Sequence, residues 1–396
     1  MAGDAQLDDV ARRANVPIDF ARRLTALGAV SDDPTIAVQH QLGRMRLLFA
    51  WSQAGFPPET IMRLVDRKAL SITFLDAPGV KTAERLDRRY EDIARERGTS
   101  QRLVERLHES IGFEPPTPND LAGEDDLVQL DVIELFRSVD VPEEAVLRLF
   151  AVYADAARRL AKAEAELYEA NIEGRLRARG MNERELIEFG TAFGNRVSAA
   201  LERAIVSVYR RHRVHAWIEH SVNHVEVALD AEGIESHVPQ PPAICFVDLT
   251  GYTRLTEERG DRFAADVAAK LASLVKVIAR RRGGSSIRWL GDGGMFHFRD
   301  PAHAVEAGLD MVEQAPAIGL PPAHIGIHAG PVIFQDGDVY GRTVNLASRL
   351  ASVAQAGEVV VSAEVAHRVE GVRLDDMGPI SLKGVAVPMQ LFRAMR

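Results

Sequence analysis

The sequence lacks the features that mark several classes of protein. Its single cysteine, Cys245, excludes an internal disulfide framework and fits a reducing compartment. No apolar run approaches the roughly 20 residues that a transmembrane helix needs, and the first residues lack the basic head and apolar core of a secretory signal. The net charge of −9 argues against a general nucleic-acid binder, which needs a concentrated basic surface. We therefore expect a cytoplasmic protein without a membrane span or a nucleic-acid partner.

The composition is that of a folded protein with more than one domain. The chain has 396 residues, of which 46% are hydrophobic and 27% are charged, and this length favours two or three domains. Stretches rich in proline and acidic residues at 112–126 and 230–242 indicate connectors, because paired prolines break helices and strand ladders. We predict one domain over residues 1–229 with a sub-boundary near 112–126, a linker over 230–242 and a second domain over 243–396.

The two predicted domains differ in their hydrophobic pattern. Residues 127–170 and 182–229 carry apolar residues three and four apart with few glycines, which is typical of amphipathic helices. After residue 242, short segments rich in β-forming residues alternate with helical segments, and the first of these strands is expected over Ala243–Leu249. The sequence therefore predicts an α+β protein, in which an all-helical N-terminal domain precedes a sheet with flanking helices.

Residues 7–65 resemble the helical DNA-binding region of MerR-type regulators. The resemblance is carried by LDDVARRANVP, as the start of a helix-turn-helix, and by LLFAWSQAGFPPETIMRLV, as the helix pair that follows it. Residues 1–70 hold nine Lys or Arg against eight Asp or Glu, so they lack the positive stripe of a phosphate-gripping module. The wing segment with its aromatic and arginine is replaced by SDDPTIAVQHQ. We favour a protein-packing role for this segment over DNA binding.

Two aspartates at expected chain reversals are candidates for a metal site. In ICFVDLTGYTRL, Asp248 ends a buried strand before a turn into a helix, where free backbone N–H groups suit a polyphosphate. In IRWLGDGGMFHF, Asp292 lies at the tip of a hairpin. Each aspartate alone has an ordinary explanation as a helix cap or a turn residue. Together on adjacent strand ends they would hold Mg²⁺ or Mn²⁺.

Five motifs follow one another in order after residue 242: FVDLTGYT, WLGDGG, HIGIHAGPV, DVYGRTVNLASRL and LKGVAVPMQLFRA. In this order and spacing they resemble the catalytic domain of class III adenylyl and guanylyl cyclases. The resemblance implies a ferredoxin-like βαβ-type sheet with flanking helices, and an enzyme that converts ATP to 3′,5′-cyclic AMP and pyrophosphate. It also implies a homodimer with two composite sites, because metal-binding and purine-binding groups come from opposite subunits in this family.

The resemblance assigns roles to individual residues. Asp248 and Asp292 align with the aspartates that bind two divalent cations, Mg²⁺ or Mn²⁺. Arg288 occupies the purine-reading position where adenylyl cyclases usually have lysine, and Asp338 aligns with the aspartate that accepts a hydrogen bond from the adenine amino group. Three further residues align with groups that contact the rest of the nucleotide: Asn345 with the residue that orients the ribose, Arg349 with the arginine that stabilises the transition state, and Lys383 with a lysine that contacts the triphosphate.

The choice of substrate depends on Arg288. Arginine and lysine are not interchangeable in a fitted pocket, so selectivity for ATP over GTP is expected to be relaxed or the rate lowered. The spacing of Asn345 and Arg349 independently predicts that a helix brings both to one face. Adenylate cyclase is the leading hypothesis. The alternatives are a guanylyl or dual-specificity cyclase, a catalytically quiet nucleotide-sensing module, and a DNA-binding regulator with an appended sensor domain.

Four histidines lie near the end of the last predicted N-terminal helix: His212, His215, His220 and His224. Their pairs are three and four apart and are therefore neighbours on a helix surface. A solvated basic face and a metal site both fit this spacing. A third hypothesis is that their protonation near neutral pH repositions the two halves of a dimer and switches activity. The resemblance to bacterial cyclases with a helical, often autoinhibitory regulatory domain implies that the N-terminal domain responds to a small molecule or a proton.

Overall fold

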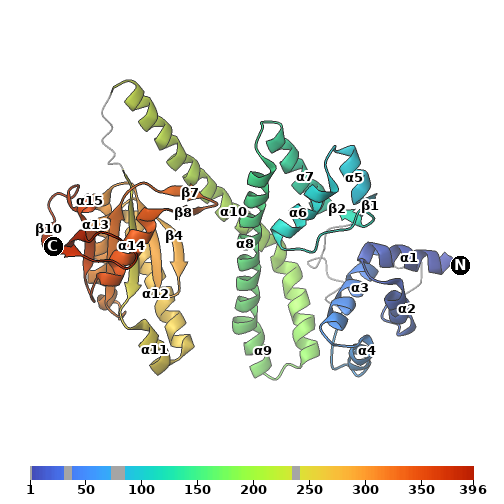
Figure 1. Ribbon diagram of the computed structural model, residues 1–396. Helices are drawn as coiled ribbons and strands as arrows, with labels where there is room; N and C mark the ends of the chain where they lie inside the picture. The colour runs from blue at the N-terminus through green and yellow to red at the C-terminus, as the bar shows by residue number, and fades with distance from the viewer. Residues whose placement is uncertain (1, 31–37, 73–84, 234–240) are drawn as a thin grey trace. The chain divides into compact units, whose positions relative to one another are not determined.

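The computed structural model describes residues 2–30, 38–72, 85–233 and 241–396. The chain divides into two compact units, Met1–Ile218 and Glu219–Arg396, and the division falls within the long helix α10 (Glu183–Ala231) (Figure 1). The boundaries expected at residues 229 and 242 stay predictions, and residues 234–240 of the expected linker lie outside the described residues. Among the described helices, none combines the length and apolar character that a bilayer crossing requires.

The N-terminal unit is helical, as the spacing of its apolar residues predicts. A π-helical turn at Glu169–Glu173 joins two of its helices, and one short antiparallel ladder of β1 (Arg85–Arg89) and β2 (Leu121–Gly123) adds to the predicted helices. Five and three residues are too short for a recognisable strand pattern, so this ladder was not foreseen. The helices that precede α10 are α1 (Ala2–Ala14), α2 (Ile18–Ala26), α3 (Val38–Gln53), α4 (Pro58–Asp66), α5 (Tyr90–Glu96), α6 (Gln101–Ile111), α7 (Glu124–Arg137), α8 (Glu143–Tyr168) and α9 (Gly174–Ala178).

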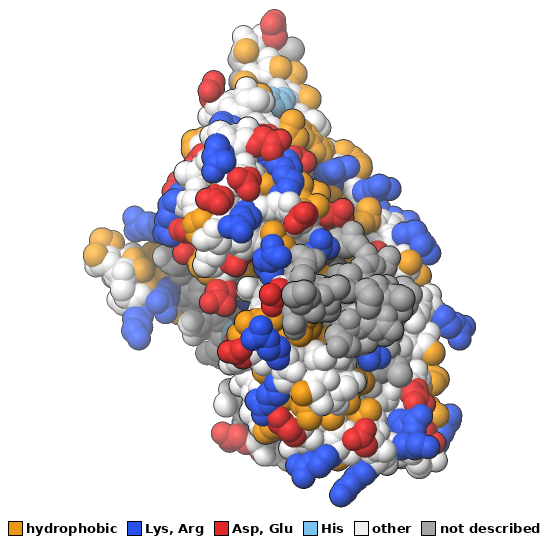
Figure 2. All heavy atoms as spheres, turned by 90° about the vertical axis from the view of Figure 1, so that its right-hand side faces the viewer, with side chains coloured by type: hydrophobic (Ala, Val, Ile, Leu, Met, Phe, Trp, Pro, Cys, Tyr) orange, Lys and Arg blue, Asp and Glu red, His pale blue; other side chains and the backbone are white. Residues whose placement is uncertain are grey.

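The apolar residues of this unit form two separate clusters. One is built by α1 to α4 around Leu24, Met45 and Leu48, and the other by α5 to α8 around Tyr90 and Ile133. Helix α6 is held at its start by the Ser100 side chain, which accepts a hydrogen bond from the Leu103 amide at 3.1 Å. On the side of the molecule drawn in Figure 2, the visible Lys and Arg side chains lie among Asp and Glu rather than in a stripe of one sign.

A buried polar network lies inside the second cluster. The Tyr90 hydroxyl donates to Asp126 Oδ2 at 2.6 Å, and His108 Nε2 lies 3.3 Å from Asp126 Oδ1. The other ring nitrogen, His108 Nδ1, lies 2.9 Å from the carbonyl oxygen of Val104. One ring nitrogen of His108 therefore faces the Asp126 carboxylate and the other faces a backbone carbonyl, so His108 links Asp126 to α6.

The C-terminal unit is built on a mixed seven-stranded sheet in the order β10-β11-β9-β6-β3-β5-β4. Neighbouring strands are antiparallel except for β6 and β9, which are parallel. The strands are β3 (Ala243–Leu249), β4 (Gly284–Leu290), β5 (Gly293–Phe298), β6 (Ala323–Ala329), β9 (Val359–Ser362), β10 (Arg373–Ile380) and β11 (Met389–Met395), with a separate hairpin of β7 (Ile333–Gln335) and β8 (Asp338–Tyr340). The helices are α11 (Tyr252–Arg259), α12 (Asp261–Arg281), α13 (Pro301–Ala317), α14 (Arg342–Val353) and α15 (Ala363–Ala366). The predicted order of a helical region followed by a sheet with flanking helices is thus confirmed, and the β1–β2 ladder is the departure from an all-helical first domain.

Alternation along β3 separates two apolar cores. Cys245 and Val247 belong to the core that includes residues of α12 and α13, whereas Ile244 packs in a second core with Ala347 of α14. Because side chains alternate along a strand, Asp248 shares its face with Ile244 and therefore lies on the α14 face of the sheet. A Cβ built on Gly326 of β6 would lie 2.0 Å from the Ala351 amide nitrogen, so only glycine permits α14 to pack this closely.

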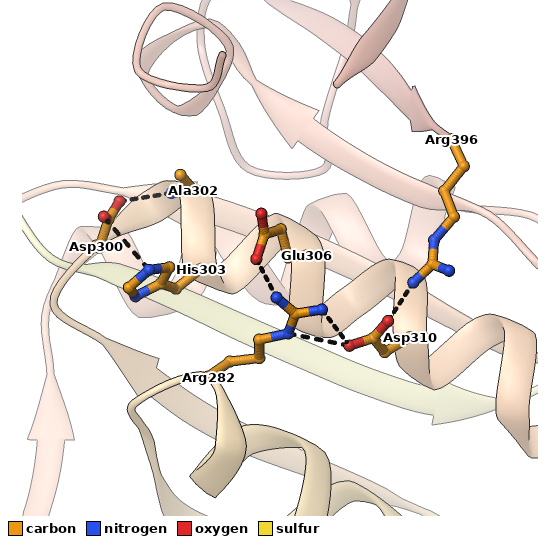
Figure 3. A network of polar contacts seen from close by, with 7 residues as sticks. All are labelled: Arg282, Asp300, Ala302, His303, Glu306, Asp310 and Arg396. Atoms are coloured by element: carbon orange, nitrogen blue, oxygen red, sulfur yellow. Dashed lines mark hydrogen bonds and ion pairs between the residues drawn. The ribbon is translucent and has the colours of Figure 1, made fainter. Parts of the chain in front are cut away.

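A network of ion pairs joins α12, α13 and the last strand (Figure 3). Arg282, directly after α12, donates to Asp310 from Nε at 3.1 Å and from Nη2 at 2.9 Å, and it also pairs with Glu306. Arg396 pairs with the same Asp310 and with Glu313 at 2.7 Å. These contacts are of the networked kind that stabilises more than isolated surface pairs do.

Candidate active site

Asp248 and Asp292 lie side by side at neighbouring strand ends. Strand β3 pairs with β5 so that Val247 faces Gly294, and Asp292 lies in the two-residue connection between β4 and β5, as predicted. A Cβ built on Gly293 would lie 2.7 Å from the Val247 carbonyl oxygen and 3.2 Å from Asp248 Oδ1. The carboxylate of Asp248 is thus packed against the turn that carries Asp292, and glycine at 293 leaves it room.

The electrostatics of this pair favour a bound cation. Burial, and then the nearby Asp292 carboxylate, raise the pKa of Asp248 to about 6, against the lowering effect of the hydrogen bond from the Leu249 amide at 3.0 Å. His324 Nε2 lies 3.8 Å from Asp248 Oδ2, but burial lowers the pKa of His324, so a neutral imidazole supplies no compensating charge at neutral pH. Two like charges at one point are the environment that a divalent cation relieves.

The donor set suits Mg²⁺ or Mn²⁺ shared with a phosphate-bearing ligand. Within the described ranges, no group of three or more His, Cys, Asp or Glu is arranged to hold a metal ion. Mg²⁺ is commonly bound through one or two carboxylates together with water and substrate phosphates. Asp248 and Asp292 fit that pattern, and a cation held by protein side chains alone does not.

Arg288 of β4 and Asp338 of β8 form an ion pair with each other. The Asp338 side chain is 16% exposed and that of Arg288 is 46% exposed. Asp338 Oδ1 also accepts a hydrogen bond from the Val339 amide at 2.8 Å, which fixes the orientation of the carboxylate. The fold therefore brings together a donor and an acceptor whose residues are 50 positions apart in the chain.

A cleft of about 430 Å³ brings together Asn345, Arg349 and Lys383. Asn345 and Arg349 lie on one face of α14, as their spacing predicts. Lys383 reaches the cleft from a turn closed by a hydrogen bond from the Val385 amide to the Leu382 carbonyl at 3.1 Å, and Leu382 is buried and anchors that turn. The cleft is also lined by Arg342, Leu346, Gly384, Val385 and Ala386.

The basic groups of this cleft are not neutralised by neighbouring carboxylates. Counting only residues that the structure describes, Arg342, Arg349 and Lys383 make no side-chain hydrogen bond or ion pair. Three cations and one amide in a common cleft have the chemistry that suits a polyanion.

Known proteins with similar sequences identify the C-terminal region. Residues 235–393 match the adenylate and guanylate cyclase catalytic domain. That region is therefore similar to the catalytic domains of adenylate and guanylate cyclases.

The cyclase match extends beyond this domain in some relatives. An adenylate cyclase of Streptomyces coelicolor is 28% identical over 284 residues, which are 71% of this chain and 72% of that protein. A pH-sensitive adenylate cyclase of Mycobacterium tuberculosis is 30% identical over 160 residues, which are 39% of this chain and only 40% of that protein. Among solved structures, the adenylyl cyclase CyaB from P. aeruginosa covers 39% of this chain and 93% of its own, with 27% identity and a TM-score of 0.36.

Within the cyclase domain, the predicted site residues form three groups. The carboxylate pair, the Arg288–Asp338 pair and the α14 cleft are each assembled by the fold, but the cleft has no lining residue in common with either pair. Two neighbours were not foreseen. Arg342 lines the cleft seven residues before Arg349, a spacing that could have indicated a shared helix face. His324 faces Asp248 only through the β3–β6 register, which no local pattern reveals.

The four histidines proposed as regulatory lie outside the cyclase site groups. His212, His215, His220 and His224 are all exposed on α10. His220 Nε2 and His224 Nε2 are 3.0 Å apart, with ring centroids at 4.6 Å. This contact agrees with the neighbour relation that their spacing predicts, and their regulatory role stays a prediction.

Proposed function

We propose that the protein is an adenylate cyclase, which converts ATP to 3′,5′-cyclic AMP and pyrophosphate. The observation that carries the proposal is the juxtaposition of Asp248 and Asp292 at neighbouring strand ends, where burial and like charge raise the pKa of Asp248 to about 6. Relatives named as adenylate cyclases support ATP as the substrate. Two cations, Mg²⁺ or Mn²⁺, would be held by these carboxylates; bound there, they supply acidification of the ribose 3′ hydroxyl and charge compensation at the phosphates.

The Arg288–Asp338 pair is the proposed adenine reader. Adenine offers an acceptor at N1 and a donor at N6, so Arg288 would donate to N1 while Asp338 accepts from the N6 amino group. Guanine offers a donor at N1 and an acceptor at O6, the reverse pattern, and would place O6 against the Asp338 carboxylate. The amide that already holds Asp338 Oδ1 leaves Oδ2 for the base. Entry of adenine replaces the ion pair with one hydrogen bond to each partner.

The cleft residues would act on the sugar and the reacting phosphate. Asn345 would hold the ribose so that O3′ lies in line with the α-phosphorus, which lowers the entropic part of the barrier. A new bond forms between O3′ and the α-phosphorus, the bond from that phosphorus to the β-phosphate bridging oxygen breaks to release pyrophosphate, and the 3′ hydroxyl proton passes to water. Arg349 would donate to the α-phosphoryl oxygens as charge develops there. Lys383 would contact the departing pyrophosphate.

We further propose a homodimer in which each site uses the carboxylates of one protomer and the purine pair and cleft of its partner. Neither Asp248 nor Asp292 lines the cleft that holds Asn345, Arg349 and Lys383, which is compatible with this division. The β7–β8 hairpin also presents Ile333, Phe334 and Tyr340 at 63%, 59% and 47% exposure, an apolar surface of the kind that a partner covers. The N-terminal unit would regulate the dimer in response to a small molecule or a proton, together with the α10 histidines, of which His220 and His224 belong to the C-terminal unit.

Incubation of the full-length protein with Mn²⁺ and either ATP or GTP, followed by product analysis, tests the proposed function. We expect cyclic AMP and pyrophosphate in equal amounts from ATP, a lower rate from GTP, and no product from the Asp292→Asn variant. Equal product from wild type and Asp292→Asn would overturn the proposal, and cyclic GMP as the main product would replace ATP with GTP. Because inhibition by the N-terminal unit would mask activity, residues 235–396 alone must also be inactive before the enzyme assignment is abandoned.

A further inference from the structure

Arg342 is a basic residue of the α14 cleft to which neither the motif alignment nor the proposed mechanism assigns a role. It is the first residue of α14, and it precedes Asn345 by three positions and Arg349 by seven. Those spacings place all three on one helix face, and all three line the cleft that Lys383 completes from the far turn.

The position of Arg342 is electrostatically unfavourable in the absence of a ligand. A cation in the first turn of a helix faces the positive end of the helix dipole. Arg342 also shares its cleft with two further cations, and it has no carboxylate partner within the part of the chain that the structure describes. An arginine that served only stability would be better placed beside an acidic residue, as Arg282 is beside Glu306 and Asp310.

We propose that Arg342 binds the polyphosphate of the nucleotide, together with Lys383 and on the side of the cleft away from Arg349. This inference rests on the proposed function and deepens it, because it assigns a substrate-binding residue for the β- and γ-phosphates and for the pyrophosphate product. The planar guanidinium fork matches two phosphate oxygens at once. A bound polyphosphate also relieves the repulsion among the three cations, so binding and stability are linked.

A binding experiment with sodium tripolyphosphate in EDTA tests Arg342 without catalysis or metal. Titration calorimetry on the full-length protein would compare wild type with Arg342→Gln, Arg342→Lys and the control Arg373→Gln. Arg373 is an exposed arginine of β10 that pairs with Asp375 at 3.4 Å, outside the cleft. We expect binding about tenfold weaker in Arg342→Gln, in line with loss of a charge-assisted contact, a smaller loss in Arg342→Lys, and wild-type binding in the control.

Thermal unfolding separates a ligand-binding role from a structural one. Without tripolyphosphate, Arg342→Gln should unfold at the same temperature as wild type or higher, because an uncompensated charge has been removed. With tripolyphosphate, the rise in Tm should be smaller in Arg342→Gln than in wild type. A lower Tm without ligand, with an unchanged rise on addition, would show that Arg342 is structural and overturn the inference.

Nucleotide kinetics distinguish failure of this inference from failure of the proposed function. If wild type makes cyclic AMP, Arg342→Gln should raise KM for ATP and weaken inhibition by pyrophosphate about tenfold, with a smaller change in kcat. Absence of tripolyphosphate binding to wild type, or equal binding to Arg342→Gln, would overturn the inference even in an active enzyme. If neither the full-length protein nor residues 235–396 form a cyclic nucleotide, but wild type binds tripolyphosphate through Arg342, the proposed function fails and the polyphosphate site stands.

Discussion

In the N-terminal unit, Tyr90 and His108 surround Asp126 with hydrogen-bond donors inside a packed core, whereas in the cyclase domain Asp248 and Asp292 face each other with like charge. Burial acts on both Asp126 and Asp248, and in both it favours the neutral acid. At Asp126, hydrogen bonds from His108, Tyr90 and the Gly123 amide outweigh burial and hold the pKa below its usual value. At Asp248, the second carboxylate adds to burial, and the pKa rises to about 6.

This difference separates polar groups that stabilise the fold from polar groups whose charge is compensated only when a ligand binds. A satisfied buried network contributes to a unique native state, while unpaired charges reduce stability and are typical of functional sites. The α14 cleft also holds like charges without partners, but these are positive: Arg342, Arg349 and Lys383 lack carboxylate partners among the described residues. Neutralising Asp126 should therefore lower stability, whereas neutralising Asp248 should raise it.

The largest effect is expected for Asp248→Asn, which should reduce cyclase activity about 10³-fold, since the cations proposed to bind these carboxylates would lower the barrier by several kcal/mol. The same variant should raise Tm in EDTA at pH 7.5, because it removes a buried charge next to Asp292. Thermal scans with and without Mn²⁺ check this, and the Mn²⁺-dependent rise in Tm should disappear. Asp266→Asn, on the exposed face of α12, is the control and should change neither quantity. A destabilised Asp248→Asn protein would contradict the view that the pair is strained.

Asp248 and Asp126 also predict opposite dependences of stability on pH. The raised pKa of Asp248 means that the metal-free native state binds more protons than the unfolded chain between pH 3.8 and about 6. The contribution of Asp248 to the free energy of unfolding is therefore fully present at low pH and is lost as the pH rises through about 6. The lowered pKa of Asp126 gives stability that is present above its unfolded pKa and lost as pH falls. Urea unfolding between pH 4 and 7 should show a steeper rise with pH in Asp248→Asn than in wild type. An unchanged slope would argue against the raised pKa.

The next effect in size is expected for Asp126→Asn. Because Tyr90, His108 and the Gly123 amide would lose their charged acceptor in a buried network, the free energy of unfolding should fall by about 3 kcal/mol. Denaturant unfolding of the full-length protein, followed by a probe in the N-terminal unit, measures it. The control is Asp131→Asn, since Asp131 is 57% exposed and pairs with Arg97 at the surface, where a pair contributes about 1 kcal/mol or less. Equal losses in the two variants would show that the buried network is no stronger than a surface pair.

A smaller effect is expected where the sheet meets α14. Gly326→Ala places a Cβ 2.0 Å from the Ala351 nitrogen and 2.6 Å from the Ala347 oxygen, so α14 must shift, at a cost of about 2 kcal/mol. Because α14 carries Asn345 and Arg349, activity should fall together with stability. Gly194→Ala is the matched control, since nothing lies within 4 Å of its Cβ and alanine is the better helix former there. A Gly326→Ala enzyme with wild-type activity would mean that the position of α14 does not limit catalysis.

Local pattern predicted much of the cyclase domain, and long-range pairing accounts for what it missed. Ala243–Leu249 is a strand as predicted, because a short run of β-forming residues ends at a turn. Helices α11 and α12 are separated at Gly260, where φ is 82°, so one stretch with a helical pattern forms two helices. Strand β10 was not predicted, because its sequence RLDDMGPI lacks the apolar alternation of a half-buried strand. The order of the motifs predicted most residues of the candidate site. The ion pair between Arg288 and Asp338 was not predicted, because it depends on the contact between β4 and β8, which no local spacing encodes.

The smallest predicted effect concerns nucleotide selectivity. It tests whether the Arg288–Asp338 pair binds the nucleotide base or only stabilises the fold. Arg288→Lys keeps the charge but replaces a planar, multi-donor group with a single ammonium. If the pair reads the base, the ratio of kcat/KM for ATP to that for GTP should rise about fivefold, within the range that one altered pocket contact gives. If the pair only braces β4 against β8, Tm should fall and the ratio should stay constant. Because Arg288 is 46% exposed, bracing contributes little, so the selectivity ratio is the quantity that should move.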